Sequence, residues 1–399
     1  MSQRKYYPTV FALYMMYFIL GIAVTITCQY KQEFAYMWNL GTLPDGTLDV
    51  SGVMAVIAAA GLGRLLALPV AGPFSDRYGR RSSALVGAGL FLVFFLGMPF
   101  APNQQVAYVL TMFEGMANSF TDTSVTPSCM EIFGENGVVA NLFTKFSVSL
   151  SQLLLPFMIL GFTALQISFR MLYLTGAALI LLDGILLIFL PFPEGTKTKA
   201  KQDRKKDRIH LNPSMVALIG IGFTSTATFQ LYLNCNQELG VLYGLQHPQM
   251  TQVFYSIGTV CAVICTSILI KKGLRPVRVL LFYPVFSVVT LLLVYFIRVP
   301  ISCLLGGFGI GYFAGGGVLQ LAVSAANAMY PEQKGKMTSI IMIASSLADY
   351  VILNIAGALS GMFGTNGPAA VLIFNMLITC AGILIAAFLN VQYEKGTAL

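Results

Sequence analysis

The chain has 399 residues, of which 56% are hydrophobic and only 10% are charged. Because soluble domains carry charges on roughly a quarter of their residues, this composition and a mean hydropathy of +0.76 exclude a soluble globular protein. The formal net charge of +8 does not indicate binding to nucleic acid, because the basic residues are spread over loops between apolar runs.

Apolar runs of about 20 residues or more follow one another along the whole chain, and each is long enough for a helix to cross about 30 Å of hydrocarbon. Glycine and proline within them are tolerated, because neighbouring helices satisfy the freed backbone groups. We therefore expect an all-α membrane protein. Its twelve predicted transmembrane helices cover residues 8–37, 49–74, 83–101, 104–130, 139–163, 168–191, 212–237, 249–270, 277–297, 300–330, 336–361 and 368–391.

Lysine and arginine concentrate in every second loop and in both tails. Basic loops mark the cytoplasmic face of a membrane protein, so both termini are predicted to be cytoplasmic. The lipid bilayer is the expected environment, and we expect a multi-pass protein of the cell membrane, which in a bacterium is the inner or plasma membrane.

The longest polar stretch separates six predicted helices from six others. It reads "EGTKTKAKQDRKKDRIH" and is expected to be a solvated cytoplasmic linker. The predicted organisation is an N-terminal six-helix half at 1–193, a linker at 194–211 and a C-terminal six-helix half at 212–399.

The two halves share sequence features. A shift of 205 residues places Gln29 on Asn234 and Glu33 on Glu238, so both first helices carry a polar stripe with helical spacing. A shift of 194 residues places Gly79 on Gly273 within two basic loops. Parallel repeats of this kind are typical of transporters whose binding site lies near the membrane midplane, between the halves.

The loop after the second predicted helix carries the pattern G-x-x-x-D-R-x-G-R-R. Its glycines favour a tight turn, and its acid is placed to meet a helix N-terminus or an arginine. With twelve helices and a central basic linker, the pattern resembles the signature of the major facilitator superfamily. The residues that carry the resemblance are Gly72, Asp76, Arg77, Gly79, Arg80 and Arg81.

The resemblance implies a secondary transporter, not an enzyme, that works by alternating access as a monomer. It further implies a gating role for the signature loop, whose acid helps to latch the halves together when the outward side is open. There is no Walker A pattern for ATP, and we expect neither a cofactor nor a metal ion.

Polar side chains inside membrane helices are costly and usually functional. The fourth predicted helix carries Glu114, Asn118 and Asp122 at i, i+4 and i+8, and the resemblance places predicted helices 1, 4, 7 and 10 around the central cavity. Amides also join helices to one another, so some of these residues are expected to be structural. The predicted substrate-binding residues are Gln29, Glu114, Asn118, Lys145, Gln230, Asn234, Glu238, Gln320 and Asn327.

Proton coupling needs a carboxylate that reaches the cavity and exchanges its proton as the helices move. Asp122 is the first candidate, because it is central in the fourth predicted helix and near the height of Lys145. Glu33 is the second candidate and Glu131 the third. The structural alternative is a fixed Asp122–Lys145 pair that only joins two helices.

Arg64 and Asp349 lie at similar depths in predicted helices 2 and 11, which the resemblance places against each other. A cation and an anion at one depth should pair, because either alone is costly in lipid. We therefore predict a contact between them, or one bridging residue, with a role in gating.

These features favour proton-coupled symport of a small polar, sugar-like solute, and the run "GMANSFTDTSVTP" resembles the fucose-permease-like branch of the superfamily. Efflux of amphipathic compounds by proton antiport is an alternative, supported by the 29 Phe and 18 Tyr. Organic-anion transport is another, because Arg64 and Lys145 offer positive charge. A membrane receptor or scaffold is the alternative outside transport.

Overall fold

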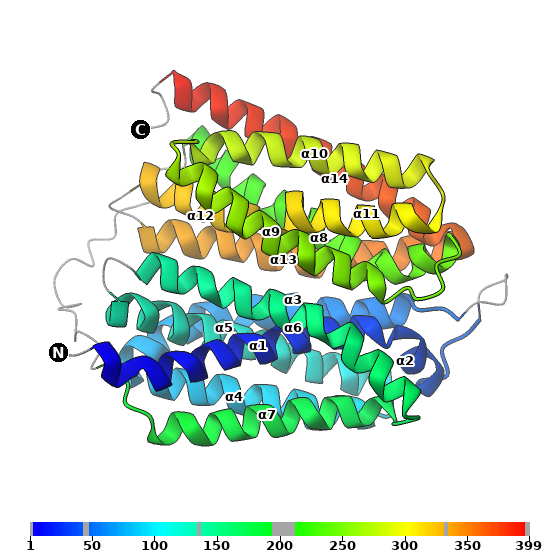
Figure 1. Cartoon of the computed structure of the whole chain (residues 1–399), viewed down its shortest axis with the longest axis horizontal. Coiled ribbons are helices and arrows are strands. Elements are labelled where there is room, and N and C mark those ends of the chain that lie inside the picture. The colour runs from blue at the N-terminus through cyan, green and yellow to red at the C-terminus, as the bar shows by residue number, and fades with distance from the viewer. Residues whose placement is uncertain (1–2, 43–47, 134–136, 194–211, 331–333, 396–399) are drawn as a thin grey trace.

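The computed structural model describes residues 3–42, 48–133, 137–193, 212–330 and 334–395, and these are helical almost throughout (Figure 1). The predicted linker at 194–211 lies outside the described residues. The N-terminal helices are α1 (Tyr7–Gln29), α2 (Lys31–Met37), α3 (Ser51–Tyr78), α4 (Arg80–Gly97), α5 (Gln104–Phe133), α6 (Gly137–Ala164) and α7 (Phe169–Phe189). The C-terminal helices are α8 (Pro213–Leu242), α9 (Met250–Lys271), α10 (Pro276–Phe296), α11 (Pro300–Ile310), α12 (Val318–Met329), α13 (Lys334–Phe363) and α14 (Gly367–Glu394).

The predicted all-α membrane class is confirmed by these helices. Ten stretches of the described chain are long and apolar enough to cross a membrane, and the last of them, Met337–Glu394, contains most of α13 and all of α14. Helix α5 is two residues longer than α3 but less apolar, because it carries the polar stripe that begins at Glu114.

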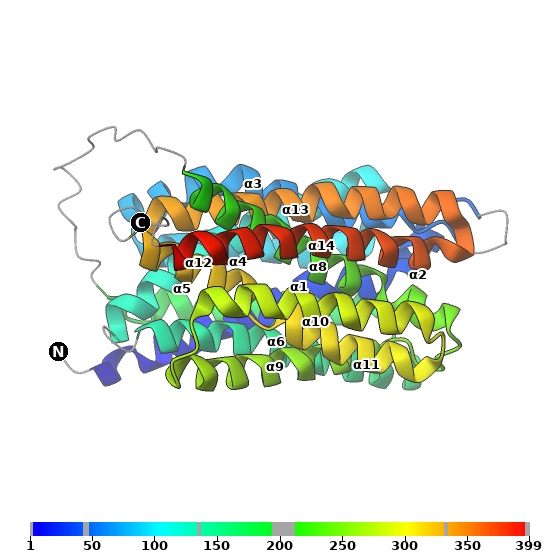
Figure 2. The ribbon, with the colours of Figure 1, turned by 90° about the horizontal axis from the view of Figure 1, so that it is seen from above.

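The N-terminal helices and the C-terminal helices form two layers that meet along two seams (Figure 1). Helix α3 packs against α13 in one seam, and α6 packs against α9 in the other; Figure 2 shows the seams on opposite sides of the bundle. Helix α1 begins and α14 ends at the same end of the bundle, which we call the terminal end (Figure 1). The opposite end, where α2 lies, is the far end.

Glycines set the distances between the helices that carry charge. A Cβ atom added to Gly115 of α5 would lie 1.9 Å from the carbonyl oxygen of Ala60 in α3. A Cβ atom added to Gly63 of α3 would lie 2.0 Å from the carbonyl oxygen of Met112 in α5. In the first seam, a Cβ on Gly61 would lie 2.6 Å from the Tyr350 backbone nitrogen of α13. Only glycine permits such close approach, so α3 is tightly packed against both α5 and α13 at its midpoint.

A proline in α5 is compensated by a side chain from α3. Pro127 has no N–H group, which leaves the carbonyl of Thr123 without its helical donor. The Ser75 hydroxyl donates to that carbonyl at 2.8 Å, so the end of α3 replaces the missing hydrogen bond.

Two of the predicted transmembrane helices are interrupted. The run at 8–37 forms α1 and α2, with a break at Tyr30. The run at 300–330 forms α11, a π-helical turn at Gly311–Gly315 and α12. Gly317 has φ of +113°, a left-handed conformation that favours glycine. The glycine-rich stretch therefore breaks this helix.

The two basic loops that match in sequence also match in backbone conformation. Gly79, between α3 and α4, has φ of +93°, and Gly273, between α9 and α10, has φ of +96°. A side chain at either position would be strained. The glycine of the signature pattern is thus explained by the turn that both copies make.

Candidate functional site

An ion pair lies at the middle of the N-terminal helices. Arg64 of α3 donates from Nη2 to Asp122 Oδ2 of α5 at 3.0 Å, and the two side chains are 14% and 25% exposed. The Tyr17 hydroxyl of α1 donates to the other carboxylate oxygen of Asp122 at 2.5 Å. The close α3–α5 contact at Gly63 and Gly115 brings the pair together.

Two further acids face this ion pair. Asp349 of α13 accepts a hydrogen bond from Gln230 Nε2 of α8 at 2.7 Å, and its charge acts on Arg64 together with that of Asp122. Glu114 is 2% exposed, and the charges that act on it are those of Asp349 and Arg64. The Asp122 carboxylate therefore contacts the guanidinium group of Arg64, and the charge of Asp349 in the other layer also acts on it.

The predicted Arg64–Asp349 pair is not formed in this structure. The seam does bring the two helices together, because a Cβ on Gly61 would lie 2.8 Å from the Asp349 Cβ. However, Arg64 pairs with Asp122, which lies on the neighbouring helix of the same layer, and Asp349 bonds to Gln230 instead. Among the described residues, no single residue is hydrogen-bonded to both Arg64 and Asp349, so neither the direct contact nor the bridge is formed here.

Lys145 of α6 completes this group of charges. The charges of Asp122 and Arg64 act on it, yet among the described residues no ion pair or hydrogen bond of Lys145 is found, so the fixed Asp122–Lys145 pair is not formed. Arg64 also has an unused donor, because its buried Nε has no hydrogen-bond partner. We call Tyr17, Arg64, Glu114, Asp122, Lys145 and Asp349 the central cluster.

Several predicted substrate-binding residues lie at the far end, where they join the two layers. Lys31 of α2 reaches the Glu238 carboxylate of α8 at 2.7 and 2.9 Å and donates to the Asn234 carbonyl oxygen. Beside it, Gln237 donates to Gln29 at 2.6 Å. These contacts close the far end between α1–α2 and α8.

The far-end lysine was not found from the sequence. Lys31 sits near a membrane interface, where such a side chain usually extends to water, but its side chain is only 1% exposed. Tyr17 was also missed, because a tyrosine among the apolar residues of α1 gives no sign that its hydroxyl meets Asp122.

The signature loop is bonded within its own layer at the terminal end. Arg80 donates to Asp76 at 2.7 Å and to Glu131 of α5 at 3.3 Å, so Glu131, the third proton candidate, is held by an arginine. Arg81 donates to the Leu190 carbonyl at 2.6 Å. The Arg77 guanidinium lies over the Tyr78 ring.

Gly72, the first residue of the signature pattern, makes no close helix contact here, because no atom lies within 4 Å of the position of an added Cβ. The hydrogen bonds of Asp76 and Arg80 likewise stay within the N-terminal helices. Among the residues that the structure describes, Asp76 and Arg80 thus make no latch between the layers at the terminal end, whereas contacts close the far end.

The side chains of the other predicted residues form no bond to the central cluster in the part of the chain that the structure describes, although Asn118 lies one turn from both Glu114 and Asp122 on α5. Glu33 is exposed on α2, and Asn118 and Gln320 are half-buried on α5 and α12. Asn327 of α12 accepts a hydrogen bond from Thr338 of α13 at 3.2 Å.

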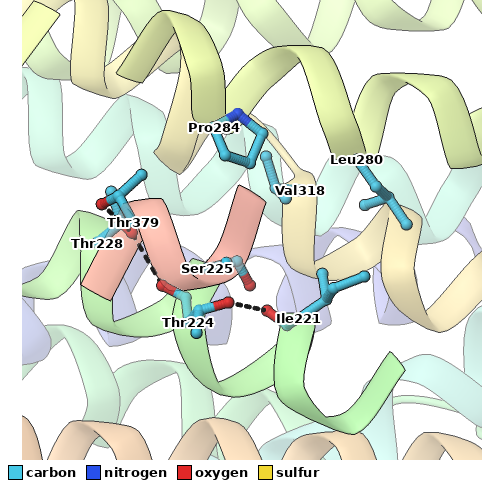
Figure 3. Close-up of a pocket in the computed structure, with 9 residues that line it drawn as sticks. Ile221, Thr224, Ser225, Thr228, Leu280, Pro284, Val318 and Thr379 are labelled. Atoms are coloured by element: carbon cyan, nitrogen blue, oxygen red, sulfur yellow. Dashed lines mark hydrogen bonds between the residues drawn. The ribbon is translucent and has the colours of Figure 1, made fainter. Parts of the chain in front are cut away.

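A small cavity lies inside the C-terminal layer, lined by hydroxyl groups such as those of Thr224, Ser225 and Thr228 (Figure 3). Thr228 and Thr379 are hydrogen-bonded at 2.9 Å on its wall. Its volume of about 10 Å³ is room for about one water molecule. The cavity is therefore not a solute site, and the central cluster is the better candidate.

Comparisons with known proteins place the chain in a family. Residues 7–349 match the family model described as Major Facilitator Superfamily. The uncharacterized MFS-type transporter YfkL of Bacillus subtilis is 31% identical, with 98% of this chain and 97% of that protein covered. The inner membrane transport protein YdiN of Escherichia coli is 28% identical, with 99% and 94% covered.

The fold is shared with solved transporters. A crystal structure of a D-xylose-proton symporter superposes with a TM-score of 0.77 at 14% identity, and the match covers 96% of this chain and 97% of that one. The ten membrane-length stretches of the described chain, the signature loop and the family match over residues 7–349 agree with one another. The chain is a multi-pass membrane transporter, not an enzyme, and belongs to the major facilitator superfamily.

Proposed function

We propose that this chain is a proton-coupled symporter that moves a small polar, sugar-like solute across the bacterial plasma membrane by alternating access. In this proposal residues 1–193 and 212–399 are the two moving halves, 194–211 is the linker between them, and the terminal end faces the cytoplasm. In this proposal a monomer is sufficient for transport, because the solute and proton sites both lie within one chain.

The observation that carries the proposal is the position of Asp122. Its carboxylate lies at the middle of a membrane helix, remains 25% exposed, and contacts a cation and a hydroxyl from two other helices. A proton on Asp122 removes its negative charge and weakens its attraction to Arg64. Since Arg64 also faces Asp349 in the other layer, the proton changes the forces across the seam.

A polar, hydroxylated solute is supported by unsatisfied amide groups. Gln230 Oε1, Asn234 Oδ1 and Gln29 Nε2 are buried without hydrogen-bond partners. Leaving such atoms unpaired is costly, and hydroxyl groups both donate and accept. A solute that bonds these amides relieves that cost. The shared fold of the D-xylose-proton symporter is in keeping with this class of solute.

The test uses purified full-length protein in proteoliposomes. Labelled monosaccharides and sugar acids are offered with and without an inwardly directed proton gradient. We expect accumulation above the external concentration only with the gradient. Accumulation that does not depend on the gradient, or none for any solute, contradicts the proposal.

A further inference from the structure

The basic side chains of the central cluster have unused capacity for an anion. Arg64 makes one charged contact, through Nη2 to Asp122, while its buried Nε has no partner. A guanidinium group presents five donors in a planar fork that matches a carboxylate. The ammonium group of Lys145 makes no ion pair among the described residues, although it lies within the field of Asp122 and Arg64.

The charges divide unevenly around Arg64. Lys145 and Arg64 share a single facing acid, Asp122, on the side of α5 and α6. Asp349 acts on Arg64 from α13, Glu114 of α5 lies within the field of Asp349 and Arg64, and Tyr17 of α1 donates to Asp122. Of the three acids in the cluster, only Asp122 is paired with Arg64, and Asp349 is bonded to Gln230 instead. Arg64 Nε and the Lys145 ammonium group therefore have no carboxylate partner among the described residues, and an unpaired cation inside a membrane is costly.

We propose that Arg64 and Lys145 bind the carboxylate of the transported solute, and that this carboxylate takes the place of Asp122 on Arg64 when Asp122 is protonated. The solute is then a hydroxylated monocarboxylate, such as a sugar acid. This inference rests on the proposed function and specifies its substrate class. Tyr17 holds the protonated Asp122 in place, and the amides of α8 bond the solute hydroxyls.

The exchange of Asp122 for the solute carboxylate on Arg64 couples proton binding to solute binding. When Asp122 is ionised, its carboxylate is paired with Arg64 and repels the negatively charged carboxylate of a solute. With Asp122 protonated and no solute, Arg64 is left without its ion-pair partner, which is strongly unfavourable for a buried charge. The proton and the carboxylate therefore bind together, and the pair carries no net charge through the membrane.

The lack of net charge gives a test that does not depend on any variant. Proteoliposomes are given either a pH gradient or an inside-negative potassium diffusion potential, and uptake of labelled D-gluconate is compared with that of D-glucose. We expect the pH gradient to drive gluconate uptake and the potential to have no effect on it. Uptake of glucose driven by both forces supports the proposed function but overturns this inference, and no proton-driven uptake of any solute overturns both.

Binding is tested by thermal stabilisation of the whole protein at acidic pH. The probes are D-gluconate, D-galactonate and D-xylonate, each beside its neutral aldose. We expect the acids alone to stabilise the protein, and Lys145→Gln to weaken their apparent affinity by ~10–100-fold, as for loss of a charged hydrogen bond. Lys145→Arg should retain binding of the acids. Arg64→Lys, which loses the planar guanidinium group with its several donors, should weaken binding of the acids.

Arg298→Gln removes an exposed far-end cation and serves as the matched control, which should bind like the unmutated protein. Equal stabilisation by the neutral aldoses, no stabilisation by any of the acids, or full acid binding by Lys145→Gln overturns the inference.

Discussion

Removal of the Lys31 ammonium should open the far end of the transporter. Its Nζ contacts both oxygens of Glu238 at 2.7 and 2.9 Å, and the backbone carbonyl of Asn234, so every bond it makes to α8 joins the two layers. Lys31→Met keeps an unbranched side chain that is one atom shorter, and it removes these bonds. It leaves Glu238, whose side chain is 19% exposed, without its cation.

The magnitude follows from the burial of the two partners. Loss of one partner of a fully buried ion pair costs ~3–5 kcal/mol, because a charge is left buried and unpaired. Glu238 retains some exposure and gains water when the far end opens, so we expect about 2 kcal/mol of the stability of the closed far end to be lost. This corresponds to about a 30-fold shift toward the open form.

Two native cysteines report this opening. Cys28 of α1 and Cys235 of α8 are 2% and 8% exposed, and both lie within the field of Lys31. Alkylation by a membrane-impermeant maleimide in nanodiscs, read for each peptide by mass spectrometry, should become about 30-fold faster in Lys31→Met. Cys303, which is 0% exposed, should remain unreactive.

The control for this experiment is Arg298→Gln, which removes another far-end cation that makes no ion pair among the described residues. A charge exchange, Lys31→Glu with Glu238→Lys, should return the alkylation rates toward those of the unmutated protein. If Cys28 and Cys235 react no faster in Lys31→Met than in the control, the ion pair does not hold the far end closed.

Three other substitutions have distinct expected effects. Asp122→Asn should abolish proton-driven accumulation while exchange of labelled for unlabelled solute survives; a variant that still concentrates solute shows that the proton is carried elsewhere, and Glu33 becomes the candidate. Asp76→Asn should slow turnover without loss of thermal stability, because this carboxylate is 72% exposed, and an unchanged transport rate excludes the latch role. Gly115→Ala should cost about 1–3 kcal/mol through overpacking against α3, measured as a lower unfolding midpoint than that of the control Gly89→Ala, where no atom is within 4 Å.

The helices were predictable because the length of an apolar run is a strong signal in a membrane protein. The runs around the signature loop, for example, became α3 and α4 with Gly79 between them. The break near Gly317 was not predicted, since glycines inside a membrane helix more often serve close packing. Whether such a run stays helical depends on a left-handed residue that composition does not reveal.

The partners of the charged residues were predicted less well, for a geometric reason. A rise of about 1.5 Å per residue fixes the height of Arg64, Asp122 and Asp349 within their helices, and all three do lie in one central region. The direction in which Arg64 points depends on the rotation of α3, which is set by its glycine contacts with α5 and α13. The glycine contacts between these helices cannot be predicted from a single sequence.

Helix α8 connects the two sets of charges. Gln230 binds Asp349 in the central cluster, and the next residue of the same stripe, Asn234, donates to the Gln230 carbonyl at 3.0 Å and accepts from Lys31. Glu238 follows one turn later in the far-end ion pair. Residues with i, i+4, i+8 spacing lie on one face of a helix and move together when the helix moves. If a change of charge around Arg64 shifts α8, the same shift strains the bonds between α8 and Lys31. Protonation at the centre and opening at the far end are therefore linked through a single helix, and this linkage requires that Gln230→Leu alter both proton-driven uptake and the alkylation rate of Cys28.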